Sequence, residues 1–313
     1  MADREFILTA KRAKTVEFYD IQGNGLAKLD MPSSVHELTL SPDRSCAFGS
    51  VYGGGSFGQN KNPDHRIVVI DLTSRSVKGF IGTNSYLAPH GLMFGPDGLL
   101  WVTAEIDKAL LGIDVESQQV VAEIKTGRAA HWLAAGPRSE RLYLSKKTST
   151  ALGVVDLFSR KLLRQIDVPG GCEGLALSAD AGRLYVACHE AAQLHMVDTR
   201  SDKIVKSVRV EGSKSGGGQL RRVRLTPDER WMLMSSHQDG EVAIFSLPDM
   251  RQVGLVAVGR GSMGFAFADD HDRTLVCVHD DAMVATLDLP SGKVVSSFIT
   301  GAGCEYAQYL GDS

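Results

Sequence analysis

The stretch EGLALSADAGRLYVACHEAAQLHMVDTRSDKIVKSV, residues 173–208, contains four short apolar segments separated by turn-forming residues. Ala-Asp, a relative of the Pro-Asp turn, follows the first segment, and the third segment ends at Asp198. A Ser-Asp-Lys turn then leads into the fourth segment. Because Asp, Ser and Gly favour tight turns, the stretch predicts four short strands joined by turns.

Related stretches recur along the whole chain at nearly constant spacing. The other copies begin with HELTLSPDRSCAF at His36, HGLMFGPDGLLWV at His90, HWLAAGPRSERLYL at His131, RRVRLTPDERWMLM at Arg221, MGFAFADDHDRTLVCV at Met263 and EYAQYLGD at Glu305. Successive starts are 54, 41, 42, 48, 42 and 42 residues apart, so the period is 42 with two insertions. Four short strands in each period are typical of one β-propeller blade.

The two ends of the sequence together supply one more blade. Residues 5–31 provide only its second, third and fourth strands, and residues 305–311 provide only a first strand. Pairing the N-terminal strands with the C-terminal strand closes the ring and removes the exposed sheet edges. The sequence therefore predicts an all-β protein, a seven-bladed propeller with four-stranded antiparallel blades, as a single domain over residues 1–313.

The repeated unit resembles the YVTN-type propeller repeat through SADAGRLYVACHEAAQLHMVDTRSDKIVKSV, residues 178–208, and its copies. One blade, through APHGLMFGPDGLLWVTAEID at residues 88–107, is similar to the repeat of the streptogramin lyase family. That family opens a cyclic ester by elimination at a divalent metal. Sugar lactonases and muconate-type cycloisomerases are also seven-bladed propellers, so these resemblances imply a lyase, an isomerase or a lactone hydrolase.

Composition and charge limit which binding partners and which cellular compartment we expect for this protein. The net charge is −3 and no basic block is present, so no nucleic-acid partner is expected. No apolar run approaches the length of a membrane span, and MADREFILTAKRAK has no signal-peptide core. The five cysteines form no CxxC pair, and we expect reduced thiols in a cytoplasmic protein with a small-molecule partner.

Two rings of polar positions are expected to meet at one mouth of the propeller channel. The entrance ring, at the start of each first strand, consists of Glu305, His36, His90, His131, Glu173, Arg221 and Met263. The loop ring, at the end of each second strand, consists of Lys11, Tyr52, Glu105, Lys147, His189, His237 and His279. Six of the nine histidines fall on these fourteen positions, where an even distribution would place fewer than one.

Imidazole and carboxylate groups at one focus are typical of a divalent metal site, with Mn, Fe, Zn, Co, Ni or Mg as the ion. The predicted ligands are His36, His90, His131, Glu173 and Glu305. Two alternatives stay open at this point: a metal-free polar pocket for a substrate, and the ordinary polar lining of a wet channel.

The remaining candidates are assigned to substrate and proton transfer. We expect Arg221 or Arg222 to hold a substrate carboxylate with two hydrogen bonds. General acid or base roles are predicted for His189, His237 and His279, with Arg221 also in the catalytic set. The predicted substrate-binding residues are Tyr52, Arg222, Glu105, Lys147 and Trp132.

Both insertions are expected over the same face as the rings. The first contains GGGSFGQNKNPDH, residues 53–65, and the second is EGSKSGGG, residues 211–218. The leading hypothesis is a metal-dependent enzyme that acts on a small oxygenated or carboxylate-bearing molecule at the channel mouth. The alternative is a non-catalytic propeller that serves as a scaffold for protein or ligand binding.

Overall fold

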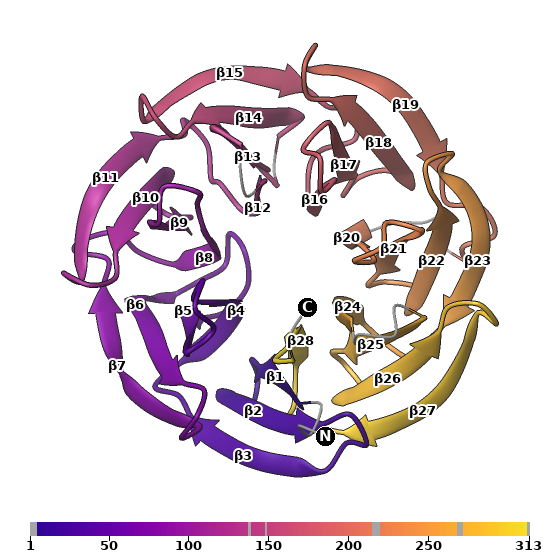
Figure 1. The fold of residues 1–313 in the computed structure, drawn as a ribbon, viewed down its shortest axis with the longest axis horizontal. Coiled ribbons are helices and arrows are strands. Elements are labelled where there is room, and N and C mark those ends of the chain that lie inside the picture. The colour runs from indigo at the N-terminus through magenta and orange to yellow at the C-terminus, as the bar shows by residue number, and fades with distance from the viewer. Residues whose placement is uncertain (1–4, 137–138, 148, 215–219, 268–271, 312–313) are drawn as a thin grey trace.

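The computed structural model describes residues 5–136, 139–147, 149–214, 220–267 and 272–311. Its strands form seven four-stranded sheets, which stand as blades around a central axis (Figure 1). No helix occurs among the described residues, so none there is long and apolar enough to cross a membrane. The predicted seven-bladed, all-β propeller is confirmed.

Blades 1 to 6 follow one another along the chain, and each begins with its innermost strand. Blade 1 consists of β4 (Ser34–Leu40), β5 (Cys46–Gly54), β6 (Asn62–Asp71) and β7 (Ser76–Gly82). Blade 2 consists of β8 (Pro89–Phe94), β9 (Leu100–Ala104), β10 (Ala109–Asp114) and β11 (Gln119–Lys125). Blade 3 consists of β12 (Leu133–Ala135), β13 (Arg141–Leu144), β14 (Ala151–Asp156) and β15 (Lys161–Asp167).

The second half of the ring repeats this order. Blade 4 consists of β16 (Leu175–Leu177), β17 (Arg183–Ala187), β18 (Gln193–Asp198) and β19 (Lys203–Arg209). Blade 5 consists of β20 (Leu220–Leu225), β21 (Trp231–Ser236), β22 (Glu241–Ser246) and β23 (Arg251–Ala257). Blade 6 consists of β24 (Ser262–Phe267), β25 (Arg273–Val278), β26 (Met283–Asp288) and β27 (Lys293–Ile299).

Blade 7 is built from both ends of the chain and closes the ring. Its strands, from inside to outside, are β28 (Cys304–Tyr309), β1 (Glu5–Ala10), β2 (Thr15–Asp20) and β3 (Gly25–Asp30). The yellow strand β28 lies beside the indigo strand β1 in Figure 1, and the two pair antiparallel, with Leu8 opposite Ala307. The predicted closure by N-terminal and C-terminal strands is therefore confirmed.

The aspartate that ends the third strand of every blade except blade 5, where Ser246 takes its place, has a local structural role. A carboxylate oxygen of Asp71 accepts a hydrogen bond from the backbone N–H of Ser74 at 2.8 Å. Equivalent bonds join Asp156 to Ser159 and Asp198 to Ser201. Because such a side chain stabilises the turn that follows it, the aspartate fixes the step from the third strand to the outer strand.

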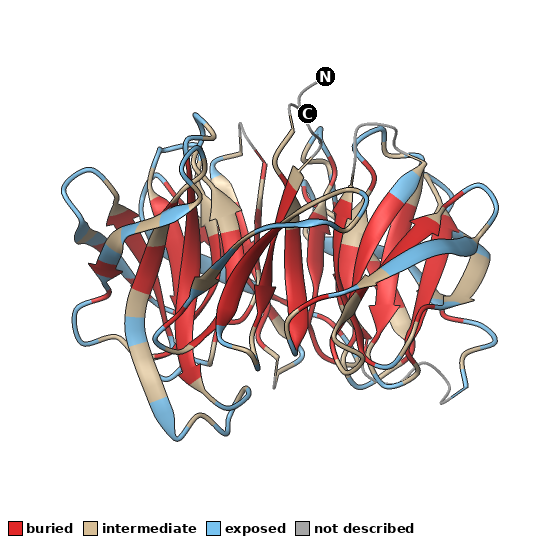
Figure 2. Cartoon of the chain, turned by 90° about the horizontal axis from the view of Figure 1, so that it is seen from below, coloured by how far each residue is buried: buried red, intermediate tan, exposed pale blue. Residues whose placement is uncertain are grey.

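Burial decreases from the channel side to the rim of each blade, as Figure 2 shows. Strand β9 is buried along its whole length, whereas the outer strand β27 is mostly exposed. Apolar side chains of neighbouring blades pack against each other to form the core, for example Ile67 and Val102 of blades 1 and 2. Blade-to-blade packing therefore holds the inner strands, and with them the channel mouth, in place.

Candidate functional site

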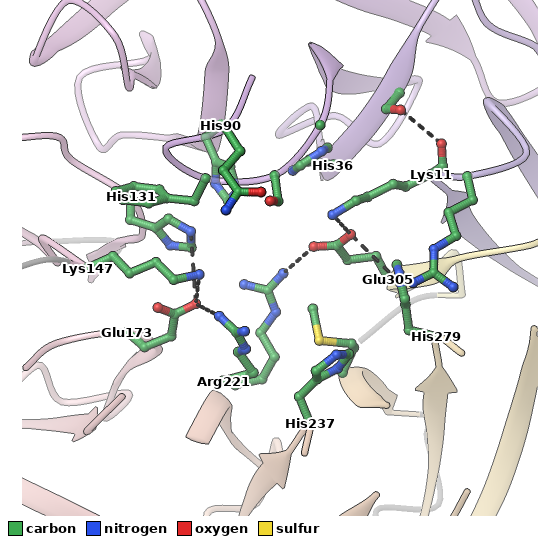
Figure 3. A pocket seen from close by; sticks show the side chains of 18 residues that line it. Lys11, His36, His90, His131, Lys147, Glu173, Arg221, His237, His279 and Glu305 are labelled. Carbon is green, nitrogen blue, oxygen red and sulfur yellow. Dashed lines mark hydrogen bonds and ion pairs between the residues drawn. The ribbon is translucent and has the colours of Figure 1, made fainter. Parts of the chain in front are cut away.

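A cavity of about 460 Å³ lies where the two predicted rings meet (Figure 3). This volume falls in the range of small-molecule sites, roughly 300–1,000 Å³. All seven residues of the entrance ring line the cavity. The loop-ring residues that join them are Lys11, Lys147, His237 and His279. The repeat alignment therefore locates this cavity, which we call the pocket.

Glu305 anchors one side of the pocket. Its carboxylate lies 2.8 Å from Lys11 Nζ and 3.6 Å from an Nη atom of Arg222. The ring of His279 approaches the same carboxylate at 4.0 Å. Glu305 is the second residue of β28 and Lys11 follows β1, so this ion pair joins the two strands that close the ring.

Glu173 anchors the opposite side of the pocket, as Figure 3 shows. Its carboxylate lies 3.2 Å from Lys147 Nζ and 3.3 Å from Arg221 Nη1. His131 and His189 both approach it at 3.9 Å. The groups around Glu173 come from blades 3, 4 and 5, so the site depends on correct packing of three blades.

Arg222 lines the pocket at its base. Its guanidinium lies 3.9 Å above the ring of Trp132 and donates a hydrogen bond of 2.6 Å to the buried carboxyl group of Glu37. Trp132 in turn stacks with Tyr306 at a ring separation of 6.5 Å. These side chains form a floor, and Trp132, Arg222 and Tyr306 also line a smaller cavity of about 50 Å³.

Three histidines form an uncharged wall between the two glutamates. His36, His90 and His131 are each at most 3% exposed. The rings of His36 and His90 meet edge to face at 5.2 Å, and those of His90 and His131 lie 4.0 Å apart. Their Nδ1 atoms, and Nε2 of His36, are buried and find no hydrogen-bond partner among the described residues. The three rings line the pocket, whereas these particular nitrogens are covered by protein.

The first insertion lies over the pocket, as predicted. Gly55, Ser56, Phe57 and Gln59 all line it, and the ring of Phe57 packs edge to face on His131 at 5.3 Å. Glu105 holds this loop, because its carboxylate accepts a hydrogen bond from the Gly58 N–H at 2.9 Å. The second insertion falls partly outside the described residues, which end at Lys214 and resume at Leu220.

Comparison with known families agrees with this architecture. A family model described as YNCE-like beta-propeller matches residues 56–224, more than half of the chain. The chain belongs to the YNCE-like β-propeller family. The YVTN-type and lyase-type resemblances are compatible with this family and stay predictions.

A solved structure, Kuenenia stuttgartiensis hydrazine synthase, is similar to this YNCE-like propeller with a TM-score of 0.75. The match covers 91% of this chain and 92% of that chain at 19% sequence identity. At this identity the likeness shows the fold alone. No match is found among curated proteins.

Burial controls the charge of the histidines in this YNCE-like propeller. It lowers the pKa of His36, His90 and His131 well below the ordinary imidazole value, because a charged ring cannot be solvated there. Burial also lowers the pKa of His237 to about 4, with the Arg221 charge as the second cause. These histidines are therefore neutral at neutral pH.

The two glutamates that face the pocket are held by cations. Burial alone would raise the pKa of Glu305, but Lys11 and other neighbouring cationic groups hold this pKa well below its ordinary value. Glu37, beneath the pocket, behaves differently: burial raises its pKa to about 8, although Arg222 opposes the shift. At neutral pH the Glu305 carboxylate is thus charged.

The predicted metal ligands gather at the pocket, but their placement does not form a ligand set. Within the described residues, no three histidine, cysteine, aspartate or glutamate side chains are arranged to hold a metal ion. Glu173 and Glu305 instead contact lysine and arginine. We therefore derive no chemical step through a metal, and the metal ion stays a prediction.

Four predicted residues lie outside the pocket lining. Tyr52 is buried behind His36 and donates a hydrogen bond of 2.5 Å to Glu105, so both support the wall and the loop. Trp132 belongs to the floor, and His189 stands behind Glu173. These four residues surround the residues that line the cavity and do not line it themselves.

The structure also adds residues to the site that the repeat alignment left out. Arg12 and Ser34 line the pocket, Phe57 covers part of it, and Glu37 contacts Arg222 from below. Arg12 and Glu37 directly follow ring members in the sequence, and this adjacency was the available signal. Phe57 lies in an insertion that has no counterpart in the other blades, so the repeat contained no signal for it.

Proposed function

We propose that this propeller binds a small molecule carrying a carboxylate or a comparable oxyanion in the pocket. One observation carries the proposal: five cationic side chains but only two carboxylates line this cavity among the described residues. The cations are Lys11, Arg12, Lys147, Arg221 and Arg222. An excess of positive charge in a partly buried site favours an anionic ligand.

The neutral histidines suit this role. A neutral imidazole offers one N–H donor and one acceptor, and the rings of His36, His90 and His131 line the pocket. His237 and His279 stand nearer the rim, where they could transfer a proton to or from a bound molecule. A lyase, isomerase or lactone hydrolase would use both features, whereas a binding protein would use only the first.

The proposal is tested by isothermal titration of the dialysed protein at constant ionic strength. The probes are acetate, benzoate, malonate, succinate and phosphate, with acetamide and succinamide as uncharged controls. We expect at least one acid to bind and the amides not to bind. Lys147→Met should raise the dissociation constant roughly 10- to 100-fold, because a hydrogen bond to a charged group is lost.

Two further variants control this experiment. Lys161→Met removes an exposed lysine of the outer strand β15 and should leave binding unchanged. Lys147→Arg keeps the charge and should retain most of the affinity. The proposal is wrong if no acid binds to the folded protein, or if Lys161→Met weakens binding as much as Lys147→Met.

A metal-dependent enzyme is the second candidate function, favoured by the unpartnered nitrogens of His36, His90 and His131. Neutral imidazoles are good ligands for Mn, Fe, Co, Ni or Zn. We expect, under this hypothesis, one equivalent of metal by elemental analysis after exposure to these ions, and its loss in His36→Ala, His90→Ala and His131→Ala. Failure to retain any of these metals would contradict it.

A further inference from the structure

We propose that residues 55–60, which we call the cover, form a hinged flap over the side of the pocket where Lys147 lies. Phe57 is the closing face of the cover and Glu105 is its latch, so a molecule reaches Lys147 only when the cover lifts. Access to Lys147 is controlled in this way whatever the pocket binds, and only the measurements with a ligand rest on the proposed function.

The cover extends from its own blade to the two blades that follow. It begins where β5 of blade 1 ends, and Gly58 contacts Glu105, which follows β9 of blade 2. The ring of Phe57 meets two residues of blade 3. It packs edge to face on His131 at 5.3 Å, and Lys147 Nζ lies 5.3 Å from its centre. A segment that passes blade 2 to reach blade 3 extends over the mouth of the channel.

Lys147 is shielded by the cover and by Glu173 together. Its side chain is only 15% exposed, and Nζ lies 3.2 Å from the Glu173 carboxylate. Lys11, on the opposite side of the pocket in Figure 3, is 18% exposed and also pairs with a glutamate, at 2.8 Å. In the described part of the chain, Lys11 contacts Glu305, Ser34 and Gly303, none of which belongs to the cover. The two lysines are therefore matched in exposure and pairing but differ in their contact with the cover.

The cover is held by few interactions with the rest of the protein. Its exposed residues are Gly55, Ser56, Gly58 and Gln59. Among the described residues, the bond from Gly58 to Glu105 is its only hydrogen bond to another blade, since Asn60 bonds to Tyr52 within blade 1. Gly55 has a φ of 115°, which side chains rarely allow, so the chain can turn where the cover begins. Exposed segments with few tertiary hydrogen bonds open at low free energy.

Glu105 acts as the latch because its carboxylate is buried and fixed in place. Its side chain belongs to a residue that is 5% exposed, and one oxygen accepts the Gly58 N–H at 2.9 Å. The other oxygen accepts the Tyr52 hydroxyl at 2.5 Å. A hydrogen bond to a carboxylate is stronger than one between neutral groups. Glu105→Asp keeps the charge but withdraws the acceptor by one methylene group, so it should release Gly58.

The test measures access to Lys147 in the ligand-free protein. N-hydroxysuccinimidyl acetate acetylates the lysines, mass spectrometry follows each site, and the exposed Lys161 is the reference within every sample. We expect Phe57→Ala and Glu105→Asp each to raise the rate at Lys147, relative to Lys161, by roughly threefold or more, because the cover is open for longer. The rate at Lys11 should stay unchanged, and Phe57→Tyr, which keeps the ring, should behave as the wild type.

Binding kinetics distinguish a cover from an ordinary ligand contact. The probe is whichever of acetate, benzoate, malonate, succinate and phosphate binds best, and NMR line shapes give its rate constants. Loss of a contact raises mainly the dissociation rate, whereas loss of a cover raises the association and dissociation rates together. We expect Phe57→Ala to raise both rates roughly fivefold or more, with a smaller change in the dissociation constant.

The outcomes separate this proposal from the proposed function. An unchanged rate at Lys147 in Phe57→Ala would overturn the cover, and so would an equal rise at Lys11, which reports general loosening of the pocket. An unchanged rate in Glu105→Asp, shown to be folded by a circular-dichroism melt, would overturn the latch. Faster dissociation with unchanged association would make Phe57 a ligand contact instead. Binding by no acid would overturn the proposed function alone, because the labelling involves no ligand.

Discussion

His237 illustrates how a single residue of the pocket couples charge to stability. Burial lowers its pKa from 6.5 to about 4. Between these two values the unfolded chain binds the proton and the folded protein does not, so the folded state is favoured less as the pH falls. The stability that His237 contributes is complete above pH 6.5 and is lost as the pH falls toward 4.

This coupling gives a pH-dependent prediction for His237→Gln. Relative to the variant, the wild type should lose roughly 1 kcal/mol of unfolding free energy per pH unit between pH 6 and 4.5, allowing for partial exposure of the ring. Urea denaturation at pH 7, 6, 5 and 4.5 measures the difference. His65→Gln removes an exposed histidine and should track the wild type. Parallel curves for His237→Gln and the wild type would contradict the prediction.

Residue positions in the pocket were predictable, but their partners were not. The repeat placed Glu173 and Arg221 in the entrance ring and Lys147 in the loop ring, and the structure brings all three together. Lysine and arginine side chains are long enough to cross from one blade to the next, so the alignment could not show that they engage the carboxylates. The metal prediction treated those carboxylates as available ligands for this reason.

Three glycines show how elements approach one another at the pocket. Gly91, Gly174 and Gly264 each directly follow an entrance-ring residue; Gly91 and Gly264 lie in β8 and β24, and Gly174 directly precedes β16. A Cβ at Gly174 would lie 2.5 Å from the Arg221 carbonyl oxygen, and one at Gly264 would lie 2.6 Å from that of Glu305. The missing side chain lets each inner strand lie against the start of the next one, where the pocket residues stand.

Gly91→Ala should therefore disturb the site through the backbone. Its methyl group would clash with the carbonyl oxygen of His131, so β8 and the start of the next blade must move apart. We expect a loss of about 1–3 kcal/mol of unfolding free energy, measured by urea denaturation, together with weaker binding of the best acid.

A matched glycine separates this effect from strand propensity. Gly79 lies in the outer strand β7, where an added Cβ meets no atom within 4 Å. Gly79→Ala should leave stability unchanged or slightly raised and should not alter binding. Equal losses in the two variants would show that close approach to His131 is not the cause.

The strands, which repeat along the chain, could be predicted from the sequence. The first insertion, which does not repeat, could be predicted only in part. The 42-residue period predicted the strands and the aspartates, or Ser246 in blade 5, that end the third strands, because turn chemistry is local. The first insertion was placed over the correct face, but its internal conformation depends on Glu105 and His131, which come from blades 2 and 3. Such contacts between blades have no signature in the insertion itself.

At the scale of the whole molecule, closure of the ring was the most secure prediction from the sequence. An incomplete unit at each end, with complementary strands missing, leaves one arrangement that pairs every inner strand. The pairing of β1 with β28 confirms it. Function was less accessible, because a propeller supports many activities and only its channel mouth distinguishes them.

The ion pair between Lys11 and Glu305 also determines at what stage of chain synthesis the pocket can form. These two residues are separated by 294 positions in the sequence, and all the other blades lie between them. A ribosome has to pass Glu305 before that side of the pocket can form. Under the proposed function, a nascent chain would bind its ligand only after Glu305 has been made, and the bound ligand would hold together the first and last strands of the propeller.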